Sequence, residues 1–158
     1  MRRPNLVLTG FMATGKTATG RIAADRLGLA FVDLDDDIER AEGRTISRIF
    51  AEDGEATFRA AEKRAVARVA SRSGQVIATG GGAVLDPVNR AALASSGVLV
   101  NLRASVRTIL ARSKGAAHRP LMAGDRKQAV EKRLAERASV YDSIRYQVET
   151  DGKTPAEV

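Results

Sequence analysis

The stretch "LVLTGFMATGKTATG", Leu6–Gly20, decides the fold of this chain. An apolar run stops at Gly10, and a Gly-Lys-Thr triplet begins at Gly15. This segment satisfies the spacing G-x-x-x-x-G-K-T, with a predicted strand before it and an alanine-rich predicted helix after it. A loop of this length curls its backbone N–H groups around an anion, and the positive end of the next helix points at the same place. The sequence therefore predicts a loop that binds nucleotide phosphates.

Individual residues of this loop receive separate roles. Lys16 is expected to reach the β- and γ-phosphates and to take part in catalysis, and the Thr17 hydroxyl is expected to ligate Mg²⁺. Position 13 is alanine, where many small kinases of this type have another glycine. The residues of this segment predicted to bind ATP are Ala13, Thr14, Gly15, Lys16, Thr17 and Ala18.

Length and composition are those of an ordinary globular chain. The 158 residues suit one domain, 1–158, with 44% apolar and 28% charged residues. The chain has no cysteine, which excludes disulfides and thiolate metal sites and suits a reducing compartment, so we expect a cytoplasmic protein. No apolar run approaches the ~20 residues of a membrane span, and the N-terminus lacks the features of a signal peptide. We therefore expect no membrane association.

The net charge of +7, from 26 Lys and Arg against 19 Asp and Glu, indicates an anionic partner. The basic residues never form a run of five, and an aromatic content of 4% leaves little on which bases could stack. We therefore expect the charge to serve phosphate binding and solvated helix faces, with no nucleic acid as partner.

Short apolar runs alternate with longer helical stretches along the chain. The predicted strands are 5–9, 30–33, 75–79, 98–102 and 146–150. The predicted helices are 16–28, 45–54, 55–74, 87–97, 105–113 and 127–141. This alternation predicts an α/β fold with a parallel sheet covered by helices on both faces. Ligands of such sheets bind at the carboxyl ends of the strands, where the unusual loops of this sequence would gather.

The run "FVDLDDDIE" places an acidic pair at the end of the second predicted strand. If the strand continues, its period of two points Asp33 and Asp35 to the same side. Asp33 could then support Mg²⁺, and Asp35 could hold a substrate hydroxyl and accept its proton. Asp36 and Asp37 are expected to begin a helix, whose positive end favours acids. The alternative is that all four aspartates form one solvated cap.

Five motifs occur here in the order and at the separations found in one family. They are "GFMATGKT", "FVDLDDDIE", "GEATFRAAE", "VIATGGGAV" and "HRPLM". Together they resemble the shikimate kinase family over residues 5–158. The resemblance implies a P-loop NTPase three-layer sandwich with a five-stranded parallel sheet, a substrate-binding region at about 33–62 and a mobile lid at about 112–124. It also implies ATP-dependent phosphorylation of the shikimate 3-hydroxyl, in aromatic amino acid biosynthesis, with Mg²⁺ as cofactor. We expect a monomer.

The resemblance assigns residues to shikimate. By the match to G-E-x-x-F-R-x-x-E, Arg59 would bind the shikimate carboxylate, and a planar guanidinium can grasp a carboxylate with two hydrogen bonds. Glu62, one helical turn further on, could hold Arg59 in place. Arg137 in "ERASVY" would be a second carboxylate-binding arginine, with Ser139 and Val140 replacing the family's Pro-Leu. The other residues assigned to shikimate are Asp35, Gly80, Gly81 and Gly82.

The resemblance also assigns residues to ATP and to the transfer step. Arg119 in "HRPLM" would close onto the ATP phosphates with the lid and stabilise the charge of the transferred group, as an arginine finger does. Arg112 is a candidate for a similar role at the start of the lid. Lys153 and Pro155 fall where the family has a basic residue and a proline beside the adenine. The residues assigned to Mg²⁺ are Thr17 and Asp33, and those assigned to catalysis are Lys16, Asp35 and Arg119.

Three alternatives stay open. Another small-molecule kinase, for gluconate or a nucleoside monophosphate, would use the same loop, although two carboxylates paired with two arginines suit a nucleotide acceptor poorly. A GTP-hydrolysing switch would carry the guanine-binding motif N-K-x-D, which this sequence does not contain. A nucleic-acid-binding protein would show steeply salt-dependent binding.

Overall fold

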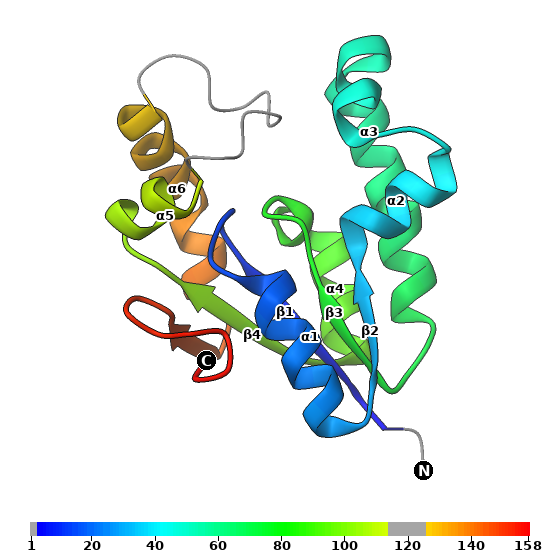
Figure 1. Ribbon diagram of the computed structural model, residues 1–158. Helices are drawn as coiled ribbons and strands as arrows, with labels where there is room; N and C mark the ends of the chain where they lie inside the picture. Colours follow the sequence, from blue (N-terminus) through cyan, green and yellow to red (C-terminus); the bar gives the residue numbers. More distant parts are fainter. Residues whose placement is uncertain (1–2, 114–125) are drawn as a thin grey trace.

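The computed structural model describes residues 3–113 and 126–158, and it confirms the predicted α/β class (Figure 1). The strands are β1 (Asn5–Gly10), β2 (Ala30–Asp33), β3 (Gln75–Ala78), β4 (Gly97–Arg103) and β5 (Tyr146–Glu149). The helices are α1 (Lys16–Leu27), α2 (Leu34–Glu42), α3 (Ile46–Ala70), the short 3₁₀ helix η1 (Ala83–Leu85), α4 (Pro87–Ser96), α5 (Val106–Arg112) and α6 (Arg126–Asp142). The strands form a five-stranded parallel sheet in the order β2-β3-β1-β4-β5.

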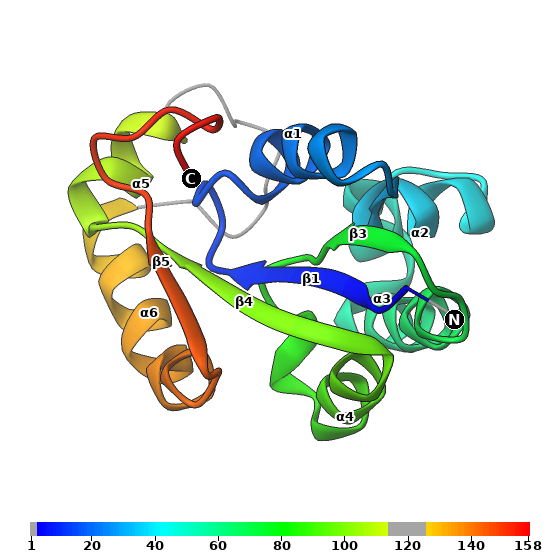
Figure 2. The ribbon, with the colours of Figure 1, turned by 90° about the horizontal axis from the view of Figure 1, so that it is seen from below.

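Two hydrophobic cores lie on opposite faces of the sheet. Val7 and Ile77 point into the larger core, which they share with residues of α3 and α4. Leu8 and Val76 point the other way, toward Ala24 of α1. Successive side chains of a strand alternate between faces, so apolar residues at every position of a central strand require cover on both sides. Figure 2 shows that cover, with α1 on one face and α3 and α4 on the other, which is the predicted three-layer sandwich.

The loops that follow β1 and β3 lie side by side at the carboxyl edge of the sheet. The two strands are neighbours in register, with Leu8 opposite Ala78. A Cβ placed on Gly81 would lie 3.5 Å from the backbone nitrogen of Met12. Figure 1 shows both loops at the upper edge of the sheet, with α2 and the first part of α3 rising beside them. Parallel strands thus bring the two glycine-containing segments of the sequence to one place.

The strand β2 ends at Asp33, as predicted, so the condition under which its period would point Asp33 and Asp35 to one side is not met. The Asp33 carboxylate instead caps α2, accepting hydrogen bonds from the backbone N–H groups of Asp35 (3.0 Å) and Asp36 (3.4 Å). Such a cap satisfies N–H groups that have no partner within the helix. The helix therefore begins at Leu34, two residues before the predicted start. Asp33 and Asp35 remain close together, but through a helix cap rather than through the geometry of a strand.

The two helices predicted over 45–54 and 55–74 form one element, α3, which is bent at Gly54. Gly54 has φ 81° and ψ 177°, values outside the helical region. The Thr45 side chain caps the start of α3 by accepting from the Arg48 N–H at 3.2 Å. The turn before the bend is held by Arg44, which pairs with Glu52 at 2.7 Å. The bend lets the first part of α3 stand beyond the sheet edge while its second part packs in the core.

None of the helices in residues 3–113 and 126–158 has the length and apolar character needed to span a membrane.

Candidate active site

The loop after β1 and the start of α1 surround a pocket of about 400 Å³. Lys16 folds back over the loop, and its Nζ donates to the carbonyl oxygens of Gly10 (2.9 Å) and Phe11 (2.8 Å). The N-terminus of α1 follows directly, so its backbone N–H groups and its positive end face the pocket. The lining residues are Ala13, Gly15, Lys16, Thr17, Ala18, Asp33, Asp35, Asp36, Thr79, Gly80 and Gly81. We call this the phosphate pocket, because it is built to receive an anion.

Thr17 and Asp33 supply two oxygen groups to the phosphate pocket. The Thr17 hydroxyl donates to Asp33 Oδ2 at 2.7 Å, although the two residues belong to different elements. Across residues 3–113 and 126–158, no group of three or more His, Cys, Asp or Glu side chains could hold a metal ion. Mg²⁺ in phosphate-transfer sites is held by one or two protein oxygens together with phosphate oxygens and water. The Thr17–Asp33 pair therefore fits an ion that arrives with a nucleotide.

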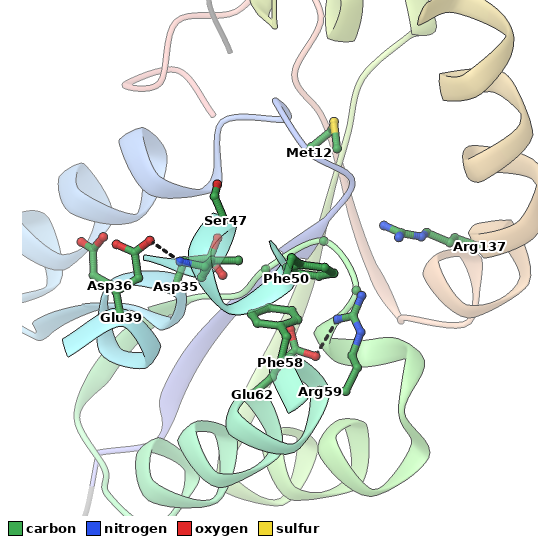
Figure 3. A pocket seen from close by; sticks show the side chains of 14 residues that line it. Met12, Asp35, Asp36, Glu39, Ser47, Phe50, Phe58, Arg59, Glu62 and Arg137 are labelled. Atoms are coloured by element: carbon green, nitrogen blue, oxygen red, sulfur yellow. Dashed lines mark hydrogen bonds and ion pairs between the residues drawn. The ribbon is translucent and has the colours of Figure 1, made fainter. Parts of the chain in front are cut away.

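A second pocket, of about 290 Å³, lies between α2, α3, the segment after β3 and α6 (Figure 3). Figure 3 shows Asp35 and Asp36 on one side of it and Arg59 and Arg137 on the other. The lining residues are Met12, Asp35, Asp36, Glu39, Ile46, Ser47, Phe50, Phe58, Arg59, Glu62, Gly80, Gly81, Gly82 and Arg137. We call this the arginine pocket. Its combination of an apolar wall, acidic acceptors and two guanidinium groups suits a small ring that carries hydroxyls and a carboxylate.

The phosphate pocket and the arginine pocket meet at four residues, Asp35, Asp36, Gly80 and Gly81, which line both. Asp35 is half-buried there, whereas Asp36 is exposed. A Cβ on Gly80 would lie 2.9 Å from Asp35 Oδ1, closer than real Cβ contacts allow, so this carboxylate rests directly on the glycine segment. A carboxylate at the junction of two pockets can act on a group that passes from one to the other.

Arg59 and Glu62 form the ion pair that their spacing predicts. Arg59 Nη1 lies 2.8 Å from Glu62 Oε1, and the Glu62 side chain is almost completely buried. Burial raises the pKa of the Glu62 carboxyl above its ordinary value, and the charge of Arg59 works in the opposite direction. Glu55 approaches the same guanidinium at 3.4 Å from the solvent side. The ion pair with Glu62 therefore fixes the position of the Arg59 guanidinium. Arg59 itself lines the arginine pocket.

Replacing Gly82 by alanine should raise KM for the substrate of the arginine pocket about tenfold while leaving the free energy of unfolding nearly unchanged. The new Cβ would lie 2.7 Å from Arg59 Nη1, and the flexible guanidinium would have to move out of the pocket. Gly82 has φ −98°, which alanine adopts without strain. Steady-state kinetics with each substrate, together with thermal unfolding, would check both parts. An unchanged KM for that substrate would mean that the position of Arg59 does not matter for its binding.

Arg137 enters the arginine pocket from α6 and lies against the glycine segment. Its Nη1 would be 3.3 Å from a Cβ on Gly81. Its guanidinium carbon lies 5.5 Å from the centre of the Phe11 ring, within the range of a cation–π contact. The structure therefore brings together Arg59 and Arg137, which are far apart in the sequence, as the resemblance implies.

Arg112 joins the phosphate loop to the C-terminal segment. Its guanidinium donates to the carbonyl oxygens of Ala13 (3.3 Å) and Thr150 (3.0 Å). Ala13 has φ 59°, a left-handed conformation that favours glycine, which explains why a glycine is common at this position. Lys153 and Pro155 lie in the exposed turn that follows β5. Arg112 thus ties the phosphate loop to Thr150, at the start of the segment that carries the predicted adenine-side residues.

Two predictions fall on residues outside the described ranges. They are the catalytic role of Arg119 and the greater part of the lid, residues 114–124.

Residues 12–158 match the family model described as shikimate kinase. A shikimate kinase of Pelotomaculum thermopropionicum is 45% identical over 147 residues, which make up 92% of this chain and 86% of that protein. This chain belongs to the shikimate kinase family. The shikimate kinase of Geobacter metallireducens is 43% identical over 155 residues, 98% of this chain and 87% of that one. A solved shikimate kinase from Acinetobacter baumannii, in complex with shikimate, is 36% identical with a TM-score of 0.93, and the match covers 98% of this chain and 87% of that one.

Membership of the shikimate kinase family confirms the predicted activity class, an ATP-dependent kinase that acts on shikimate. The match to solved shikimate kinases also confirms the P-loop architecture around the five-stranded sheet.

Sequence reasoning missed the apolar wall of the arginine pocket, formed by Met12, Ile46, Phe50 and Phe58. Phe58 is buried on α3, and its ring packs on that of Phe50 with the centroids 4.9 Å apart. A helical pattern of apolar residues does not distinguish a side chain that fills a core from one that lines a pocket. Met12 occupies a variable position of the phosphate-loop motif and gives no signal of its own. Within the shikimate kinase family the pair of phenylalanines flanking "AEDGEAT" is the pattern that could have located this wall.

Proposed function

We propose that this chain, as a shikimate kinase, transfers the γ-phosphoryl group of ATP to the 3-hydroxyl of shikimate, with ATP in the phosphate pocket and shikimate in the arginine pocket. The observation that carries this arrangement is that Asp35 lines both pockets. Direct transfer requires the attacking hydroxyl and the γ-phosphate to meet in one site, and two adjoining pockets satisfy that requirement. The reaction would serve aromatic amino acid biosynthesis.

The nucleotide would be held mainly by the loop after β1. When ATP binds, Lys16 Nζ would exchange its two carbonyl acceptors, on Gly10 and Phe11, for oxygens of the β- and γ-phosphates. The backbone N–H groups at the start of α1 would surround the same phosphates. We propose that Lys153 and Pro155 line the adenine side, and that Arg112, at the start of the lid, serves the ATP phosphates. We assign to Arg119 contacts with the γ-phosphate, on the family resemblance alone.

Thr17 and Asp33 would hold Mg²⁺, since their oxygens lie together at the mouth of the phosphate pocket. The ion, when bound, neutralises charge on the β- and γ-phosphates.

Shikimate would be held by its carboxylate, its ring and its hydroxyls. Arg59 and Arg137 present two guanidinium groups on one side of the arginine pocket, where a carboxylate can accept several charge-assisted hydrogen bonds. The aromatic pair Phe50 and Phe58 forms an apolar surface for the carbon ring. The glycine segment 80–82 allows backbone groups to approach the substrate closely.

Asp35 would orient the 3-hydroxyl and accept its proton. As the new bond forms between that oxygen and the γ-phosphorus, the bond from phosphorus to the bridging oxygen breaks, and ADP leaves. The proton of the hydroxyl passes to the Asp35 carboxylate. Much of the rate enhancement would come from positioning and charge stabilisation rather than from covalent catalysis.

The substrate assignment is tested by measuring ADP release from Mg·ATP with shikimate, gluconate or AMP as acceptor. Turnover with shikimate alone is the expected result. Comparable turnover with gluconate or AMP would leave a small-molecule kinase but remove the roles of Asp35, Arg59 and Arg137 as shikimate ligands. ADP release at one slow rate with or without any acceptor would instead favour a nucleotide-hydrolysing switch.

Replacing Arg112 by alanine should raise KM for ATP about tenfold and leave KM for shikimate unchanged. The change removes the hydrogen bonds that join Ala13 to Thr150, so the phosphate loop and the C-terminal turn lose their common anchor. The matched control is Arg107→Ala, an exposed arginine on the same helix. Initial rates with each substrate varied in turn would measure both constants. An equal rise of KM for ATP in Arg112→Ala and Arg107→Ala would show that Arg112 contributes only its charge.

We also propose that the chain works as one domain and as a monomer in the cytoplasm. Support comes from the lining of both pockets by residues of a single chain and from the absence of cysteine. Sedimentation of the active protein would test the monomer directly.

A further inference from the structure

We infer that Tyr141 is a positioning residue for shikimate, because its hydroxyl fixes both the glycine segment and Arg137. The inference rests on the proposed function, since it takes those two groups as partners of shikimate.

Tyr141 lies near the end of α6, and its side chain is 5% exposed. Its hydroxyl donates a hydrogen bond to the carbonyl oxygen of Gly81, sixty residues earlier in the chain. In a trans peptide the carbonyl of one residue and the N–H of the next point in opposite directions. Fixing the Gly81 carbonyl therefore also fixes the direction of the Gly82 N–H. Tyr141 thus sets the orientation of a peptide that lines the arginine pocket.

Arg137 lies one helical turn before Tyr141 on α6, and its charge acts on the Tyr141 hydroxyl. The Arg137 guanidinium lies against the same glycine, with its Nη1 3.3 Å from the position of a Cβ on Gly81, so the hydroxyl and the guanidinium meet at that residue. The ring of Phe11 in the phosphate loop also lies near the guanidinium, with its centroid 5.5 Å from the guanidinium carbon. Arg137 is therefore held between a ring from β1's loop, a hydroxyl from its own helix and the backbone of the glycine segment.

The tyrosine stays a neutral donor in this arrangement. Burial raises the pKa of the Tyr141 hydroxyl above its ordinary value, and the charge of Arg137 opposes that shift. A phenylalanine here would keep the buried ring but remove the hydrogen bond to the Gly81 carbonyl and the oxygen beside Arg137. Neither Tyr141 nor Arg137 lines the phosphate pocket, so removal of the hydroxyl should weaken the binding of shikimate and leave the binding of ATP unchanged.

The test is Tyr141→Phe, with Tyr146→Phe as the matched control. Tyr146 is the only other tyrosine of the chain and is 48% exposed. Tyr141→Phe should raise KM for shikimate about tenfold and leave KM for ATP within about twofold, as expected for the loss of a hydrogen bond to a charged partner. Tyr146→Phe should change neither. An unchanged KM for shikimate in Tyr141→Phe, or an equal rise in both KM values, would show that the residue only packs and would overturn the inference.

A double-mutant cycle with Arg137→Met separates this inference from the proposed function. If Tyr141 acts through Arg137, adding Tyr141→Phe to Arg137→Met should raise KM for shikimate by no more than about twofold. If the double variant instead raises KM for shikimate by the product of the two single increases, Tyr141 does not act through Arg137. If Arg137→Met alone leaves KM for shikimate unchanged, the proposed role of Arg137 fails and the inference fails with it. If Arg137→Met raises that KM and Tyr141→Phe does not, the inference alone fails.

Discussion

Replacing Asp35 by asparagine is expected to lower kcat about 10³-fold, the usual contribution of a well-placed general base, while leaving the Kd for ATP nearly unchanged. Asparagine keeps the size of the side chain and its contact with Gly80 but cannot accept the proton of the shikimate hydroxyl. The ATP phosphates are held from the other side of the junction, by the loop after β1. Single-turnover kinetics would give the rate of transfer, and calorimetric titration would give the Kd for ATP.

The matched control is Asp36→Asn, since Asp36 lines both pockets but is exposed. We expect that variant to lose no more than about threefold in kcat, because a solvated carboxylate at the rim contributes little. Equal losses in the two variants would mean that the charge of the acidic cluster matters rather than the position of Asp35. A loss of ATP affinity in Asp35→Asn as large as its loss of kcat would show that Asp35 belongs to the nucleotide site.

Replacing Glu62 by alanine should lower the free energy of unfolding by about 3 kcal/mol, as expected when one partner of a largely buried ion pair is removed. It should also raise KM for shikimate severalfold. Glu62 is 1% exposed, and its loss leaves Arg59 beside a small cavity without its closest counter-charge. Denaturant unfolding would measure the stability, and steady-state kinetics would measure KM.

Glu55→Ala is the control for that change. Glu55 contacts the same guanidinium, but its side chain is 64% exposed and the distance is 3.4 Å. An exposed pair of this kind contributes at most about 0.5 kcal/mol. If both variants lost the same stability, the burial of Glu62 would not be the source of its effect.

The layout of strands and helices could be predicted from the sequence because periodicity and helix-end residues agreed along most of the chain. Pro87 and Gly97 mark the start and end of α4 as expected. The end of β2 at Asp33 is predicted, but the cap that Asp33 forms on α2 is not, because an acid after a strand can either continue it or cap a helix and only tertiary packing decides. Gly54 marks the boundary between the two predicted helical stretches, and its φ and ψ lie outside the helical region there.

Local parts of the site could be predicted, and those that depend on distant contacts could not. The Arg59–Glu62 pair follows from helical spacing, and the phosphate loop follows from its motif. The contact of Tyr141 with Gly81 joins α6 to the segment after β3, and no local pattern indicates it. The bridge from Arg112 to Ala13 and Thr150 is of the same kind. Family resemblance named several of these residues, but not the contacts that hold them.

The central claim is that the γ-phosphate of ATP passes to one particular hydroxyl of shikimate at the junction marked by Asp35. Phosphorus–proton correlation NMR of the reaction product measures this directly. We predict a single phosphomonoester whose phosphorus couples to the proton on carbon 3 of the shikimate ring, formed in step with ADP. Coupling to the proton of another ring carbon, or the appearance of inorganic phosphate alone, would contradict the account.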